Sequence, residues 1–192
     1  TYRSLVVYYE PMHISYAGLV SSLKQVEESL GERETVASRV VEIPTLYGGE
    51  YGPDIAAVAQ HNGISEADVV ALHSGTDYLV YMIGFLPGFP YLGGMSDKIA
   101  TPRLETPRSC IPAGSVAIAG RQTGIYPVES PGGWRIIGRT PLRLFDPERE
   151  PPVVIEPGDY LRFVPVDEAE YAAVRSQIES GAYTLNTRNM GG

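Results

Sequence analysis

The apolar positions of the chain repeat at helical spacing near the N-terminus and alternate as in strands over much of the remainder. Between residues 15 and 30 they recur every three to four positions, with Ser15 as N-cap and Gly31 at the end, which predicts a helix. Strands are predicted on both sides of it, at residues 3–10 and 35–44. This order predicts a small α/β layer. Because the chain starts in a strand and without Met, we expect this layer to be truncated.

Two short helices are expected next, between residues 53 and 74. Pro53 suits the first position of the earlier helix, and Asp54 suits its positive end. Ser65 and Asp68 have the spacing of a capping box for the later one. A helix-turn-helix that reads DNA has this outline, but the acidic charge of this part of the chain argues against it.

Short strands separated by turns follow residue 77. They are expected at residues 78–85, 115–119, 134–137, 142–145, 153–155 and 160–164, with a closing helix at 168–180. A spacing near ten residues, with glycine or proline between strands, predicts a β-barrel or a sandwich. The predicted fold class is therefore α+β. We divide the chain into an N-terminal α+β domain at residues 1–76 and a β domain with a C-terminal helix at 77–192.

Charge and composition narrow the function. The net charge of −8 excludes nucleic-acid binding by bulk electrostatics. Residues 1–78 carry 11 acidic and 4 basic side chains, whereas residues 79–165 carry 8 and 9, which supports two domains. No apolar run is long enough for a membrane span, and one cysteine, Cys110, which we expect in the core, gives no disulfide framework. We expect a cytoplasmic protein without a metal site.

Residues 81–138 hold the predicted function. They contain 10 glycines and 7 prolines together with aromatic residues such as Phe85, Phe89, Tyr91, Tyr126 and Trp134. This composition is typical of an ordered surface of tight turns rather than of disorder. Such turns present rows of backbone N–H groups that can hold an anion. Six arginines lie between residues 103 and 143, and a guanidinium fork suits a carboxylate or a phosphate. The sequence therefore predicts a site for a small anionic ligand.

Several long motifs in this region resemble one family. They lie at residues 84–92, 101–103, 106–108, 111–120, 122–127, 130–134 and 137–140, and a further one lies at 47–54. Together they are similar to the allophanate hydrolase subunit 1 family, also called the carboxyltransferase C/D subdomain family. That family includes the B-type subunit of the bacterial ATP-dependent 5-oxoprolinase and the KipI-type inhibitor of a sporulation kinase. The resemblance covers nearly the whole chain.

The resemblance implies a cyclophilin-like β-barrel after the small N-terminal domain. It also implies two partners, the homologous C-type subunit of the oxoprolinase and its ATP-using A-type subunit. The three together open 5-oxoproline to glutamate. ATP would be used by the complex, and we expect no cofactor on this chain alone, because it lacks a Gly-x-x-x-x-Gly-Lys-Ser/Thr motif. We expect the chain to be inactive alone.

The motifs also supply candidate site residues. Arg103 or Arg108 could hold a lactam carboxylate or a phosphorylated intermediate, and Gln122 could orient an amide. Gly120, Gly124 and Gly132 could supply backbone N–H groups near a developing oxyanion. The remaining candidates are the aromatic residues Tyr126 and Trp134, and Trp134 could stack on a ligand. For each arginine the alternative is a structural role in its turn, and for Trp134 it is a place in the barrel core.

Catalytic roles have weaker signals. His73 is a candidate general base and Ser130 a candidate nucleophile, although Ser130 lacks a Gly-x-Ser-x-Gly elbow and an assignable histidine partner. Helix capping and a turn, respectively, are the alternatives. Glu50 and Asp54 could bind a cation or the partner, with helix capping as the alternative.

Three functions from different classes remain open at this point. The first is the B-type subunit of a 5-oxoprolinase, inactive alone. The second is a KipI-type inhibitor that binds a histidine kinase. The third is a carboxyltransferase component, the allophanate hydrolase subunit 1, of a urea carboxylase system. The third would require a biotinylated partner, since the chain has no Met-Lys biotin-acceptor motif. The fold alone would also allow a prolyl isomerase, but a fold does not fix a function.

Overall fold

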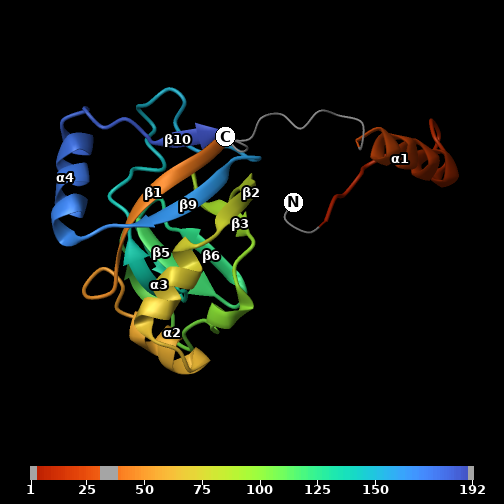
Figure 1. Cartoon of the computed structure of the whole chain (residues 1–192). Coiled ribbons are helices and arrows are strands. Elements are labelled where there is room, and N and C mark those ends of the chain that lie inside the picture. The colour runs from red at the N-terminus through yellow and green to blue at the C-terminus, as the bar shows by residue number, and fades with distance from the viewer. Residues whose placement is uncertain (1–3, 31–38, 190–192) are drawn as a thin grey trace.

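A nearly closed β-barrel forms the centre of the computed structural model, which describes residues 4–30 and 39–189 (Figure 1). The strands and the 3-10 helix η1 have these bounds: β1 (Arg39–Tyr47), β2 (Asp77–Ile83), β3 (Pro90–Gly93), η1 (Asp97–Ile99), β4 (Arg108–Ile111), β5 (Ser115–Ala119), β6 (Gln122–Ile125), β7 (Ser130–Gly132), β8 (Arg135–Arg139), β9 (Tyr160–Pro165) and β10 (Thr187–Asn189). The main sheet has the order β3-β2-β9-β1-β8-β5-β6, with β10 beside β1. Its end strands β3 and β6 lie against each other, which nearly closes the barrel. The predicted α+β barrel fold is confirmed.

The strand predicted at 35–44 belongs to this barrel and not to a separate N-terminal layer. As β1 it runs from Arg39 to Tyr47, parallel to β9 and antiparallel to β8 and β10. Six of its nine side chains are buried, which is the pattern of a strand covered on both faces. The sheet therefore crosses the boundary predicted at residues 76 and 77. Residues 35–38 of the predicted strand and the predicted helix end at Gly31 lie outside the described residues.

The segment before this strand differs in part from its prediction. Residues 4–10 form no strand, because no described strand pairs with them, and their side chains are exposed. The predicted helix is present as α1 (Tyr16–Leu30), and the Ser15 hydroxyl accepts a hydrogen bond from the Gly18 N–H at 3.1 Å, as an N-cap does.

Two helices pack against the barrel and each other, α2 (Ile55–Asn62) and α3 (Glu66–Ser74). The predicted capping box of α3 is confirmed, since Ser65 and Asp68 each bond the other's backbone N–H. The start of α2 differs: Asp54, not Pro53, is adjacent to the first helical residue, and its carboxylate makes no cap bond. That carboxylate binds elsewhere, in the site described below.

The last helix, α4 (Glu168–Glu179), lies beside the barrel near β1 (Figure 1). Strands predicted at 142–145 and 153–155 are not formed, apart from one bridge between Phe145 and Val153. Arg149 crosses this loop, and its guanidinium donates to the carbonyls of Arg143, Leu144, Pro151 and Pro152 at 3.0–3.4 Å. The Leu144 and Pro152 carbonyls also accept backbone N–H groups, from Val154 and Asp146. Longer pairing is prevented by Pro141, Pro151 and Pro152, which border the two segments and have no N–H to donate.

Candidate functional site

An aromatic cluster forms where the predicted motifs meet. The Phe89 ring, 3% exposed, lies at its centre with four rings at centroid distances of 5.6–5.7 Å, all inclined edge to face: Phe85, Tyr91, Tyr126 and Trp134. Such contacts add about 0.5–1.5 kcal/mol each beyond burial of area. Tyr126 is buried and Trp134 half-buried, whereas Phe85 is 72% exposed. The cluster is therefore core on one side and surface on the other.

Phe85 is held in an unusual backbone conformation. Its φ of 67° is the only positive value among the described non-glycine residues. This conformation is costly for a residue with a side chain, and it persists only where the surroundings impose it. Strand β2 ends at Ile83, two residues before this turn residue and before the end predicted at 85. The result is an aromatic ring presented to solvent from a fixed turn.

Two arginines flank the cluster, and they are used differently. The Arg103 guanidinium lies 5.9 Å from the Trp134 ring centroid, is exposed, and has no ion-pair partner among the described residues. Arg108 forms two hydrogen bonds with the Asp54 carboxylate, at 2.8 and 2.9 Å. Asp54 also accepts from the Ile136 N–H at 2.7 Å. Arg103 is therefore open to a ligand, whereas Arg108 and Asp54 link α2, β4 and β8.

The phenol of Tyr126 lies within the influence of both arginines. Burial raises its pKa, while the charges of Arg103 and Arg108 act in the opposite direction. A Cβ on Gly132 would overlap the Tyr126 hydroxyl, so only glycine lets β7 pass this close. A Cβ on Gly124 would lie 3.0 Å from the Phe89 ring. The structure thus brings these glycines together with Tyr126, Trp134 and the two arginines.

Gly120 and Gln122 lie at the turn of the β5–β6 hairpin instead. The Gly120 N–H donates to the Thr101 carbonyl at 2.7 Å and is not free for an oxyanion. Gln122 is half-buried and pairs with Ala119 across the hairpin. Their assignment to the site stays a prediction.

The two candidate catalytic residues are not brought together. His73 is fully buried and its ring nitrogens lie 2.7 Å from the hydroxyls of Tyr47 and Thr123. Since the Thr123 O–H donates to the Ala117 carbonyl, Thr123 accepts from Nε2–H and the Tyr47 O–H donates to Nδ1. Burial lowers the pKa of His73 to about 3, so the ring is neutral. To act as a base the ring would have to leave this network.

Ser130 lies on β7, opposite Ile111, and its buried hydroxyl has no hydrogen-bond partner among the described residues. Its role as a nucleophile stays a prediction, without a histidine beside it. The expectation that Cys110 is buried was wrong. Cys110 is exposed, and a hydrogen bond with Glu129 raises the pKa of its thiol.

The two acidic candidates are also separate. Glu50 is exposed and lines a pocket of about 520 Å³ with Tyr51 and Glu168. Asp54 is buried and committed to Arg108. Among the described residues, no three His, Cys, Asp or Glu side chains are placed to hold one metal ion.

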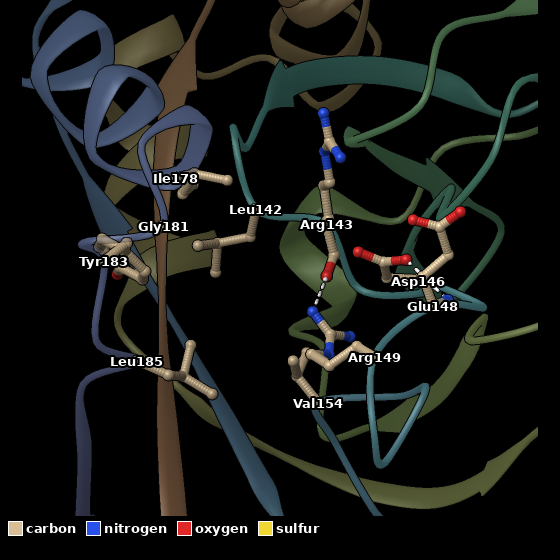
Figure 2. Close-up of a pocket in the computed structure, with 10 residues that line it drawn as sticks. All are labelled: Leu142, Arg143, Asp146, Glu148, Arg149, Val154, Ile178, Gly181, Tyr183 and Leu185. Carbon is tan, nitrogen blue, oxygen red and sulfur yellow. Dashed lines mark hydrogen bonds between the residues drawn. The ribbon is translucent and has the colours of Figure 1, made fainter.

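A further pocket, of about 470 Å³, lies between the 142–154 loop and the segment that follows α4 (Figure 2). Ile178, Tyr183 and Leu185 come from α4 and the segment after it, whereas Leu142, Val154 and the charged residues Arg143, Asp146, Glu148 and Arg149 come from the loop. None of the eight predicted substrate-binding residues lines it. Sequence reasoning did not find this pocket, because its two walls are more than 20 residues apart in the chain and carry no shared motif.

Within the described residues, 4–30 and 39–189, each helix is too short or too polar to traverse a bilayer.

Comparison with known proteins gives close relatives. The chain is 46% identical over 187 residues to the B-type subunit of the 5-oxoprolinase of Bacillus subtilis, covering 92% of this chain and 78% of that protein. It is 56% identical over 131 residues to the corresponding 5-oxoprolinase subunit from Escherichia coli O157:H7, covering 68% of this chain and 60% of that protein. The chain thus spans less than two thirds of the second relative.

Solved structures agree on the fold. A conserved uncharacterized protein of Pyrococcus horikoshii superposes with a TM-score of 0.67 at 56% identity, over 86% of this chain and 76% of that one. The urea amidolyase of Kluyveromyces lactis superposes with a TM-score of 0.71 at 20% identity, over 94% of this chain and 13% of that one, which shows a shared fold. The family model named carboxyltransferase domain, subdomain C and D, matches residues 1–155. The chain therefore belongs to the carboxyltransferase C and D subdomain family, as its motifs indicated.

Proposed function

We propose that the chain is the B-type subunit of a heteromeric ATP-dependent 5-oxoprolinase, which opens 5-oxo-L-proline to L-glutamate. The observation that carries the proposal is the 46% identity to such a subunit from Bacillus subtilis, which extends over 92% of this chain. In this proposal the chain supplies one wall of the substrate site, and the partner subunits complete it. ATP is used by the complex in the cytoplasm, and this chain alone binds no nucleotide.

The aromatic cluster and Arg103 suit that role. 5-Oxoproline carries a carboxylate on a small ring with an apolar edge. The exposed Arg103 guanidinium can donate hydrogen bonds to the carboxylate, and the Trp134 and Phe85 rings can contact the apolar edge. Arg108 stays bound to Asp54 and contributes by holding α2, β4 and β8 together.

The residues that the structure describes offer no complete catalytic set for lactam opening. His73 is buried and hydrogen-bonded at both nitrogens, and Ser130 has no described base beside it. A nucleophile and its base must lie within hydrogen-bonding reach of each other. This supports a division of labour in which the two partners, the homologous C-type subunit with the ATP-using A-type subunit, supply the remaining groups.

Reconstitution tests the proposal. The chain and its C-type and A-type partners are purified separately, and 5-oxoproline-dependent ATP hydrolysis is measured for each alone and for the mixture. We expect the chain to co-purify with the C-type partner and turnover to require the mixture. Robust turnover by the chain alone would overturn the proposal.

The two alternatives make different predictions for the same preparation. A KipI-type inhibitor would bind a histidine-kinase dimerisation domain and reduce autophosphorylation. A urea carboxylase component would support carboxyl transfer from a biotinylated partner to urea. Either result, together with no effect on 5-oxoproline turnover, replaces the proposed function.

A further inference from the structure

A third pocket, which is basic, lies between the barrel and α4. It has a volume of about 280 Å³, and its walls come from the turn at residues 113–114, the end of β8 with the residues that follow, and α4. Three arginines line it, Arg139, Arg143 and Arg175, with Glu179 as the one acidic residue. Figure 2 shows the adjoining pocket, where the Arg143 side chain extends away from Arg149 and from the acidic residues.

Arg139 is the most deeply placed of the three. Its side chain is half-buried, and its Nε–H is buried without a hydrogen-bond partner among the described residues. Its guanidinium lies 5.5 Å from the ring centroid of Tyr51. Buried N–H groups in proteins are rarely left unpaired, and each one that is requires an explanation.

A second unpaired group lies beside it. Ser115 on β5 is the cross-strand neighbour of Arg139, and side chains of such neighbours point to the same face of the sheet. The Ser115 hydroxyl is also buried without a hydrogen-bond partner among the described residues. Ser115 is fully buried and does not line the pocket, so of the two unpaired groups only Arg139 is placed to meet a ligand there.

The other buried or half-buried arginines of the described chain do have partners. Arg39 pairs with Asp159, Arg108 with Asp54 and Arg162 with Asp77, whereas Arg135 and Arg149 donate to backbone carbonyls. In the basic pocket the only ion pair among the described residues joins Arg175 to Glu179 at 3.8 Å, and both side chains are more than half exposed. Such a pair contributes little and leaves the pocket positively charged.

The pocket also offers a hydroxyl donor on a rigid support. Tyr171 is buried, and its ring packs against Tyr51 at a centroid distance of 4.9 Å. Tyr171 lines the pocket with Arg139 and Arg175. Burial raises the pKa of Tyr171, and the charges of the two arginines act against this rise. A Cβ on Gly114, whose φ is +80°, would overlap the Thr140 carbonyl, so the floor of the pocket requires glycine there.

We propose that this pocket binds an oxyanion, the carboxylate or phosphate group of a small molecule, with Arg139 as its inner ligand and Arg143 and Arg175 at its entrance. Arginine forks bind both groups through charge-assisted hydrogen bonds. A volume of about 280 Å³ lies at the lower end of small-molecule sites and suits a compact ligand. Arg175 and Tyr171 lie outside residues 1–155, which match the family model. The proposed oxyanion site does not depend on the proposed oxoprolinase reaction.

Calorimetric titration of the full chain tests the proposal, with inorganic phosphate and succinate as separate probes at low ionic strength. We expect saturable binding of at least one probe, and Arg139→Gln should weaken it at least tenfold. Arg121→Gln is the matched control, since Arg121 is an exposed arginine paired with Asp97 at another place on the barrel. That variant should bind as the wild type does. Which probe binds identifies the ligand as a phosphate or a carboxylate.

Thermal unfolding of each variant shows whether it folds. If Arg139→Gln does not fold, the double variant Arg143→Gln/Arg175→Gln replaces it, because both side chains are exposed; it should weaken binding several-fold. Three results overturn the proposal: neither probe saturates, binding is unchanged in the arginine variants, or Arg121→Gln weakens it as much as they do.

Discussion

The polar groups beside α2 and α3 and those beside α4 differ in whether the protein itself satisfies them. In the first region Asp54 binds Arg108 and the Ile136 N–H, and both nitrogens of His73 have hydroxyl partners. In the second, Arg139 and the neighbouring Ser115 each have an unpaired buried polar atom. Both regions carry residue types that are common in active sites.

The difference shows why residue type alone does not identify a site. A buried charge that is fully paired stabilises the fold only while its partner is present, and it has no capacity left for a ligand. A buried donor without a protein partner retains that capacity. The predictions below test this contrast, and the largest expected effect comes first.

Asp54→Ala should reduce the free energy of unfolding by about 2–4 kcal/mol, because it leaves the Arg108 guanidinium and the Ile136 N–H without their acceptor. Urea unfolding measures the change. The matched control is Asp97→Ala, which breaks an exposed arginine pair and should cost less than about 1 kcal/mol. Equal costs for the two variants would mean that the Asp54 pair is not a structural link.

Arg103→Gln should raise the KM of the reconstituted complex for 5-oxoproline about tenfold or more, since a hydrogen bond to a charged group is worth about 1.5–3 kcal/mol. Stability should not change, because the side chain is exposed. Steady-state ATP hydrolysis at varied 5-oxoproline measures the effect, with Arg121→Gln as the control. An unchanged KM would remove Arg103 from the substrate wall.

The His73 network should make stability depend on pH. The pKa of His73 is lowered from 6.5 to about 3 in the folded chain, so the unfolded chain binds the extra proton. The contribution of His73 is therefore complete above about pH 6.5 and is lost as the pH falls toward 3, with a slope of up to about 1.4 kcal/mol per pH unit.

Urea unfolding between about pH 5 and 6.5 isolates this slope, because the pKa of Asp77 is lowered below its ordinary value by Arg162, so that this ion pair is lost only at lower pH. In His73→Gln the free energy of unfolding should be lower at every pH in this range, but it should change less steeply with pH than in the wild type. The same slope in both proteins would show that the ring is not held neutral by burial.

Local signals explain what the sequence could predict of the fold. The capping box of Ser65 and Asp68 needs only residues three apart, and it was found. The place of β1 between β8 and β9 depends on strands about 90 and 120 residues away, and no local pattern indicates which strands pair. The segment at 142–145 has the composition of a strand, but its carbonyls bond the Arg149 guanidinium and only a few backbone N–H groups of its neighbour.

The candidate site could likewise be predicted only where its residues lie close together in the sequence. Tyr126, Gly132 and Trp134 lie within nine positions of the chain, and the structure does place them together. The Asp54–Arg108 pair spans 54 positions, so each residue was considered alone and given a ligand role. The unpaired state of Arg139 is a property of three-dimensional packing, and no sequence pattern reports it.

The measurement that tests the assignment most directly is the formation of glutamate from 5-oxoproline by mixtures from which one component is omitted. The components are this chain, its C-type and A-type partners, and ATP. We predict glutamate only in the complete mixture. Glutamate formed at the full rate without this chain, or by this chain alone, would contradict the account.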